Sequence, residues 1–213
     1  MYNTPYETVG EQGTSIMKIC LVGVSCVGKT TIGRRLAERL GYAFFDVDTA
    51  IEDYFGTSIE RLKSALLTEY AFRQKAALVL KRLVSQQEKP QCVIALPPSG
   101  LMDHYARVLK QGKCVTIALH DRPENILARI TFYDRDSHPI HKVLTAAEKA
   151  YYLREITADI TYFGTSHRKA HWQVDIAGLG IEGSVAKIEA LLREHYADRL
   201  PSVEGEPDRE RGG

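Results

Sequence analysis

Residues Gly23 to Thr31 fit the phosphate-binding loop pattern GxxxxGK(S/T) at every specified position. In such a loop, successive backbone N–H groups and the positive end of the following helix converge on the phosphate oxygens of a nucleotide. Lys29 would reach the β- and γ-phosphates, and the Thr30 hydroxyl would bind Mg²⁺. The pattern therefore predicts that the chain binds ATP and Mg²⁺. The predicted ATP-binding residues in the loop are Gly23, Ser25, Cys26, Val27, Gly28, Lys29, Thr30 and Thr31.

The sequence around the loop tests this interpretation. An apolar run at 16–22 precedes the loop, as expected of a buried strand. After the loop, Ile32, Leu36 and Leu40 recur every fourth residue, and Gly41 follows at the position of a helix C-terminal cap. The alternative, a glycine turn between an ordinary strand and helix, is disfavoured because strand, loop and helix come in the required order.

Two carboxylates follow the next apolar run. Residues 42–46 read as a second strand that ends at Asp46, and Asp48 comes two residues later. Ligands of open α/β sheets gather outside the carboxyl ends of the strands, so both acids are expected at a functional site. An alternative remains open for Asp48, which could instead cap the helix that contains Ile51 and Tyr54.

The rest of the chain alternates between short apolar runs and helical patterns, which predicts one α/β domain with a central parallel sheet. A capping box at 57–60 should start a short helix that runs through Leu67, and Asp121 and Glu124 should cap a later one. Residues 133–141 carry charge and proline without apolar period and read as a loop. The expected strands are 16–22, 42–46, 91–96, 114–119 and 172–176.

Length and composition set broader limits. The chain has 213 residues and a formal net charge of +1, which suits one domain and disfavours nucleic-acid binding. We expect a flexible extension at 1–15, a single phosphate-loop domain at 16–198 and a disordered tail at 199–213. No secretory signal and no apolar run of membrane-spanning length is apparent, and three of the four cysteines lie on apparent buried strands. These features favour a cytoplasmic location, with only Cys26 within reach of oxidants.

From Met17 to Leu192 the chain resembles the shikimate kinases, small phosphate-loop kinases related to the nucleoside monophosphate kinases. The likeness rests on the phosphate loop, then FFDVDTAIE at 44–52, GTSIERL at 56–62, and the pair Phe72-Arg73. It implies a three-layer α/β/α sandwich around a five-stranded parallel sheet in the order 2-3-1-4-5. It also implies a helical substrate-binding region near 48–86 and a lid near 131–143.

The resemblance further implies roles for individual residues. Asp46 would help to hold Mg²⁺ through water. Asp48 would hold the hydroxyls of the acceptor and accept a proton. Arg73 would pair with the acceptor's carboxylate, and Arg129 would lie against the adenine of ATP.

Departures from the family pattern cluster on the acceptor side. The family's three glycines after the third strand are replaced by Pro97-Pro98-Ser99-Gly100, which limits backbone donation because proline has no N–H. Of this loop, Pro98, Ser99 and Gly100 are taken as substrate-binding candidates. The family's FRxxE motif ends here in Ala76, which removes a glutamate that would steady Arg73.

Two further family arginines have no clean counterpart. Histidine stands at position 138, where the lid is expected to carry its catalytic arginine, and Arg135 is the candidate replacement. For the second acceptor-binding arginine, Arg154 is the candidate and Arg168 the fallback.

The sequence thus predicts an ATP- and Mg²⁺-dependent kinase that phosphorylates a hydroxyl of a small polyol acid, with shikimate, giving 3-phosphoshikimate, as the first choice. A different hydroxylated acid or a cyclitol is one alternative acceptor. A shikimate kinase-like binding module without turnover is another alternative, because the departures fall on the acceptor side. No nucleic-acid or membrane partner is expected, and the chain is predicted to be a monomer or weak dimer.

Overall fold

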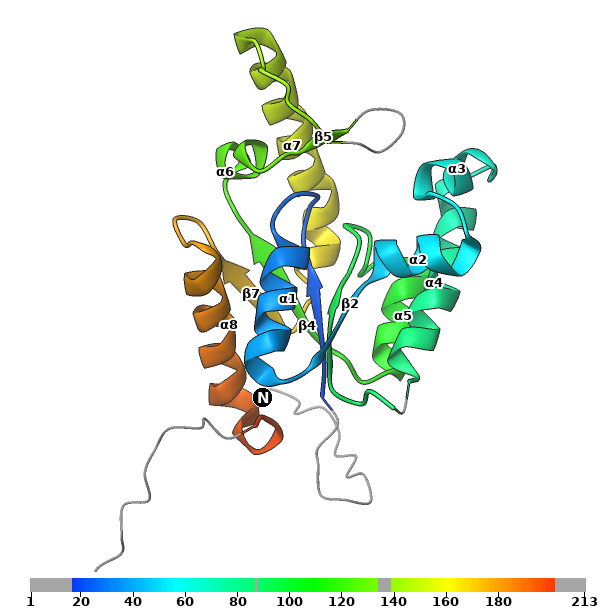
Figure 1. Ribbon diagram of the computed structural model, residues 1–213, viewed down its shortest axis with the longest axis vertical. Coiled ribbons are helices and arrows are strands. Elements are labelled where there is room, and N and C mark those ends of the chain that lie inside the picture. The colour runs from blue at the N-terminus through cyan, green and yellow to red at the C-terminus, as the bar shows by residue number, and fades with distance from the viewer. Residues whose placement is uncertain (1–16, 87, 134–138, 202–213) are drawn as a thin grey trace, which may run out of the picture.

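The computed structural model describes residues 17–86, 88–133 and 139–201, and a parallel sheet lies at its centre (Figure 1). The five strands of this sheet are β1 (Lys18–Val22), β2 (Ala43–Asp46), β3 (Cys92–Ala95), β4 (Val115–His120) and β7 (Trp172–Asp175). They lie in the order β2-β3-β1-β4-β7, and every neighbouring pair is parallel. The predicted sheet and its strand order are therefore confirmed.

Helices cover both faces of the sheet. They are α1 (Lys29–Leu40), α2 (Val47–Phe55), α3 (Ile59–Ser64), α4 (Glu69–Val84), α5 (Asp103–Gln111), α6 (Pro123–Ala128), α7 (Ala146–His167) and α8 (Ile181–Tyr196). A short 3₁₀ helix, η1 (Ala197–Arg199), follows α8. Helices α1 and α8 pack side by side on one face, and α4 and α5 pack on the other (Figure 1).

Strand β1 supplies both halves of the core because successive side chains of a strand point to opposite faces. Ile19 and Leu21 enter the apolar cluster under α1 and α8, whereas Cys20 and Val22 enter the cluster under α4 and α5. All four are buried. The apolar run before the phosphate loop thus anchors the loop at the middle of the sheet.

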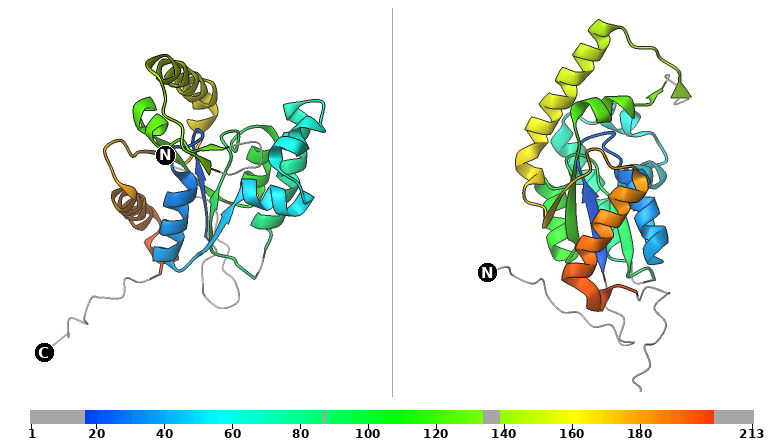
Figure 2. Two further views of the ribbon diagram at one scale, coloured as in Figure 1. Left: turned by 45° about the horizontal axis from the view of Figure 1, so that its top comes forward. Right: turned by 90° about the vertical axis from the view of Figure 1, so that its left-hand side faces the viewer.

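Helix α7 has 22 residues and extends beyond the sheet beside α6 (Figure 2). It begins with a capping box in which Thr145 and Glu148 bond each other's backbone N–H groups. Between α6 and α7, β5 (Phe132–Tyr133) pairs with β6 (Pro139–Ile140) as a short antiparallel hairpin. The prediction of a loop without secondary structure over 133–141 is therefore wrong at both of its ends. Arg135 and His138 lie outside the described residues.

Two predicted helix starts are wrong by one or a few residues. Helix α3 is capped by Ser58, which accepts a hydrogen bond from the Arg61 amide, so the capping box predicted at 57–60 does not form. The helix also ends at Ser64 rather than continuing to Leu67.

Helix α6 begins after Arg122, which makes no side-chain capping bond, and not at the acids Asp121 or Glu124. Asp121 instead accepts hydrogen bonds from the Arg122 amide and from Asn125. The second carboxylate oxygen of Asp121 pairs with Arg129, a predicted ATP-binding residue.

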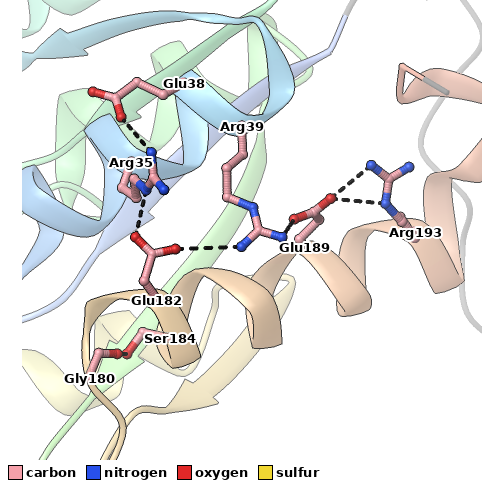
Figure 3. Close-up of polar contacts among 8 residues, drawn as sticks. All are labelled: Arg35, Glu38, Arg39, Gly180, Glu182, Ser184, Glu189 and Arg193. Atoms are coloured by element: carbon pink, nitrogen blue, oxygen red, sulfur yellow. Dashed lines mark hydrogen bonds and ion pairs between the residues drawn. The ribbon is translucent and has the colours of Figure 1, made fainter. Parts of the chain in front are cut away.

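A cluster of charged side chains joins α1 to α8 (Figure 3). The carboxylate of Glu182 lies 2.6 Å from Arg35 Nε and 3.7 Å from Arg39 Nη1. The carboxylate of Glu189 lies 2.7 Å from Arg39 Nη2 and 2.8 Å from Arg193 Nη2. The side chain of Glu189 is only 12% exposed, so its two ion pairs are the least screened of the cluster. These contacts hold the helix that follows the phosphate loop against α8.

Among the described residues, no helix is both long and apolar enough to cross a membrane. The extension expected at 1–15 lies outside these residues, as does the tail expected at 199–213 except for its first three residues. Regular structure runs as far as η1, and the domain boundaries themselves stay predictions.

Candidate active site

The phosphate loop connects β1 to α1, and the positions of Gly23 and Gly28 exclude larger residues. A Cβ atom on Gly23 would lie 2.8 Å from the Leu119 carbonyl oxygen. Gly28 is the N-cap of α1 with φ +110°, a conformation that L side chains rarely adopt. Within the loop Val27 is buried, whereas Ser25 and Cys26 are exposed. Thr30 and Thr31 are exposed in the first turn of α1.

Lys29 is folded back onto this loop. Its Nζ donates hydrogen bonds to the carbonyl oxygens of Gly23 at 3.0 Å and Val24 at 2.9 Å. Burial disfavours the charged ammonium group and lowers its pKa to about 8, although the nearby carboxylates of Asp48 and Asp46 oppose the shift. The ammonium group is thus held over the loop and must leave these carbonyls to reach a phosphate.

A chain of hydrogen bonds joins Thr30, Asp46 and Asp48. The Thr30 hydroxyl donates to Asp46 Oδ2 at 2.6 Å, and Asp46 Oδ1 accepts from the Asp48 amide at 3.0 Å. Asp46 is therefore the N-cap of α2, and the alternative in which Asp48 caps this helix is wrong. The carboxylate of Asp48 is consequently free of that structural task.

Asp48 lies in the first turn of α2 and is exposed. Desolvation by the surrounding protein atoms, followed by the Asp46 carboxylate, raises the pKa of its carboxyl, and Lys29 partly offsets this. A raised pKa makes Asp48 a better proton acceptor than an ordinary aspartate.

Thr30 and Asp46 fit the ligand set of a magnesium site at a nucleotide. Mg²⁺ in such sites takes one or two protein oxygens together with phosphate oxygens and water. Within the described parts of the chain, no group of three or more His, Cys, Asp or Glu side chains could hold a metal alone. The hydroxyl and carboxylate, 2.6 Å apart, match a cation that arrives with its nucleotide.

Arg73 lies one turn into α4 on the acceptor side. Its Nε donates to Asp103 Oδ2 at 3.1 Å, and its side chain is 17% exposed. Asp103 begins α5, directly after the loop that follows β3. Asp103 was not predicted from the sequence, because no local pattern relates two residues that are 30 positions apart.

The loop after β3 is compact. The Gly100 amide donates to the Pro97 carbonyl at 2.8 Å, and the Met102 amide donates to the Ser99 carbonyl at 2.8 Å. A Cβ atom on Gly100 would lie 2.6 Å from Leu96 Cβ, so this glycine is needed for packing and its N–H is already used. Backbone donation to an acceptor is therefore reduced here, as the prolines predicted.

His167, at the end of α7, also contacts this loop and was missed in the sequence. Its Nε2 lies 2.8 Å from the Pro98 carbonyl oxygen, which can only accept, so Nε2 carries the proton. Burial lowers the pKa of His167, while the bond to Pro98 partly opposes the shift. The C-terminal end of α7 thus contacts the loop that follows β3.

Arg129 follows α6 and lies over the phosphate loop. It forms an ion pair with Asp121 and donates to the Cys26 carbonyl oxygen at 3.4 Å. Burial of Asp121 would raise its pKa, but the hydrogen bonds from Arg129 and Asn125 lower it overall. The structure therefore places Arg129 beside the nucleotide-binding loop.

The two candidates for a second acceptor arginine both belong to α7 or its C-terminal cap. Arg154 is exposed on a groove along α7, lined also by Leu153 and Thr157. It precedes His167 by 13 residues, or about 20 Å of helix at 1.5 Å per residue. Arg168 is exposed and donates to the Thr165 hydroxyl at 3.0 Å. The role of either arginine at the acceptor site stays a prediction.

A parallel sheet with a phosphate loop at its central strand, and acids at the carboxyl end of β2 in the same sheet, is typical of phosphate-loop proteins that transfer or hydrolyse a nucleotide's phosphoryl group. The family model of shikimate kinase matches residues 25–165. The chain belongs to the shikimate kinase family.

Individual relatives agree with this assignment. The chain is 33% identical to the shikimate kinase of Neisseria meningitidis serogroup C over 141 residues, 66% of this chain and 78% of the relative. It is 32% identical to a shikimate kinase of Thermus thermophilus over 181 residues, 85% of this chain and 92% of the relative.

A solved structure of the shikimate kinase from Acinetobacter baumannii in complex with shikimate superimposes with a TM-score of 0.64 at 26% identity. The match covers 87% of this chain and 96% of that one. The predicted family, fold and enzyme class are thus confirmed: the chain is a small-molecule kinase with ATP as its phosphoryl donor.

Proposed function

We propose that this protein transfers the γ-phosphoryl group of ATP to a hydroxyl of shikimate, giving 3-phosphoshikimate. The observation that carries the proposal is the hydrogen-bonded chain from the Thr30 hydroxyl through the Asp46 carboxylate to the Asp48 backbone amide, which starts at the phosphate loop beside Lys29 and places the Asp48 residue next to it. It supports a reaction in which the nucleotide and the acceptor hydroxyl meet within one small group of side chains. Shikimate is favoured because relatives that cover most of the chain are shikimate kinases.

In the proposed reaction the phosphate loop positions the nucleotide. The backbone N–H groups of residues 24–30 hold the phosphates, and Lys29 turns from its two carbonyl partners to the β- and γ-phosphates. Mg²⁺, when bound, neutralises charge on these phosphates, and Thr30 and Asp46 would hold it. Arg129, fixed by Asp121, would border the adenine.

Asp48 is proposed to orient the acceptor hydroxyl and to take up its proton, and Arg73 to pair with the acceptor's carboxylate. Phosphoryl transfer depends mainly on positioning and charge neutralisation, and closure of a lid over 131–143 would exclude water. Arg135 and Arg154 stay the candidates for contacts from the lid and from α7. Pro98, Ser99 and Gly100 stay candidates for the wall of the acceptor site.

The experiment is a coupled assay of ADP release with shikimate beside a panel of other polyol acids and cyclitols. We expect release with shikimate and none with the rest of the panel. Release with another compound alone would replace shikimate as the acceptor, and no release with any would contradict the proposal.

A cytoplasmic location and a monomeric or weakly dimeric state stay predictions from the sequence. Sedimentation of the full chain at micromolar concentration tests the second of these.

A further inference from the structure

The guanidinium group of Arg73 needs a counter-charge because its side chain is mostly buried. Its own helix supplies none. The residues three and four positions later on α4, Ala76 and Ala77, are buried and apolar. Four positions earlier, Glu69 is paired with Lys63 at 3.3 Å.

The counter-charge comes from a different element. Asp103 reaches Arg73 at 3.1 Å from the first residue of α5, where the helix N-terminus favours a carboxylate. Its backbone has φ +45°, in the left-handed region that few side chains adopt. Two backbone hydrogen bonds, from Gly100 to Pro97 and from Met102 to Ser99, fix the path of the chain that leads to Asp103. A conformation of this kind persists only where the surrounding structure requires it.

The contact leaves the outer end of the guanidinium group available. Asp103 accepts from Nε, and within the described part of the chain neither Nη1 nor Nη2 of Arg73 has another hydrogen-bonding partner. Two parallel N–H donors are the arrangement that binds a carboxylate with both of its oxygens. Asp103 therefore orients Arg73 without occupying the pair of donors that an acceptor would use.

A second feature places the start of α5 at the acceptor site. The Tyr105 side chain is fully buried, and its hydroxyl has no partner among the described residues. Burial, followed by the nearby charge of Asp48, raises the pKa of Tyr105 well above its usual range, so the hydroxyl remains a neutral donor. Tyr105 in the first turn of α5 thus lies within electrostatic reach of both Asp48 and Arg73.

We propose that Asp103 is a positioning residue for acceptor binding, which holds Arg73 in the orientation that receives the carboxylate of the acceptor. This rests on the proposed function, since it assumes an acceptor that carries a carboxylate. It makes the turn that follows β3 a determinant of acceptor affinity through Asp103, in addition to any direct contact that its backbone makes.

The test is Asp103→Asn, which keeps the shape of the side chain and removes its charge. We expect the KM for shikimate to rise about tenfold, with the KM for ATP and kcat changed less than about twofold. Asp103→Glu should recover most of the loss because it restores a carboxylate. The matched control is Glu69→Gln, which removes an acid one turn from Arg73 that does not touch it and should leave both KM values unchanged.

A readout without turnover separates this proposal from the proposed function. The Nε–H of Arg73, assigned in a nitrogen–proton correlation spectrum by its loss in Arg73→Lys, should exchange slowly in the wild type and rapidly in Asp103→Asn. Calorimetric binding of shikimate in the presence of ADP should weaken about tenfold in the same variant.

An unchanged KM or binding constant for shikimate in Asp103→Asn would overturn the proposal, as would an equal rise in the KM for ATP. Shikimate that binds in an Asp103-dependent way but is not phosphorylated would refute the proposed function alone. Wild-type protein that does not bind shikimate at all would refute both.

Discussion

The affinity of the protein for ATP should decrease as the pH rises from 7 to 9, because Lys29 loses its proton in the free protein over this range. Burial lowers the pKa of Lys29 to about 8, from an ordinary value of 10.5. When ATP is bound, the phosphates favour the charged form and raise the pKa again. Binding is therefore coupled to uptake of about half a proton per ATP at pH 8 and about 0.9 of a proton at pH 9.

The magnitude follows from the fraction of free protein that carries the proton. With a pKa of about 8, roughly nine tenths of Lys29 is protonated at pH 7 and roughly one tenth at pH 9. The Kd for ATP should therefore rise about tenfold between these pH values, which corresponds to about 1.4 kcal/mol.

Isothermal titration calorimetry with Mg²⁺-saturated ATP measures this change, and two buffers with different ionisation enthalpies count the protons taken up. Lys29→Arg is the matched control, because its guanidinium group remains charged throughout the range and its Kd should not depend on pH. A wild-type Kd that stays constant from pH 7 to 9, or an equal rise in Lys29→Arg, would refute the reasoning.

Three further predictions concern single substitutions. Asp48→Ala should abolish phosphoryl transfer in the ADP-release assay while ATP still binds in calorimetry, and wild-type turnover in this variant would remove Asp48 from the catalytic role. Glu189→Ala should lower the free energy of unfolding in urea by about 1–2 kcal/mol, because it leaves two arginines of the cluster between α1 and α8 without their least exposed partner. The exposed acid Glu38 is the control for it, and Glu38→Gln should leave the urea midpoint unchanged. The folded state disfavours protonation of His167, so its contribution to stability is complete above about pH 6.5 and is lost as the pH falls. His167→Gln should therefore make the decrease in unfolding free energy between pH 7 and 5 shallower, and an unchanged slope would contradict this.

The sheet could be predicted from the sequence because its strands are short apolar runs that differ sharply from their surroundings. The strand before the phosphate loop and the strand that ends at Asp46 lie where the pattern indicated. The loop itself carries its own geometric signal, since Gly23 and Gly28 stand where only glycine fits. This part of the site depends on residues that are close in sequence.

Helix ends were less predictable because several polar residues can cap a helix. Thr57 and Ser58 are adjacent and chemically similar, and only the backbone path decides that Ser58 is the cap. The acid Asp121 was predicted as a cap but instead holds Arg129, a contact that local sequence cannot reveal.

Two supporting contacts on the acceptor side could not be predicted, because each joins segments that are distant in sequence. Asp103 reaches Arg73 across 30 residues, and His167 reaches Pro98 across 69. The residues next to Asp103 and His167 in the sequence form no motif that would predict their partners. The helix that contains Arg154 was predicted correctly. The sequence could not show that this helix, α7, extends far beyond the sheet (Figure 2).

The most direct test of the proposed function is phosphorus NMR of a mixture of the protein with ATP, Mg²⁺ and shikimate. We predict that a phosphomonoester resonance grows as the γ-phosphate resonance declines, and that it does not form with Asp48→Ala. Appearance of inorganic phosphate alone, or an unchanged ATP spectrum, would contradict the conclusion that this protein phosphorylates shikimate.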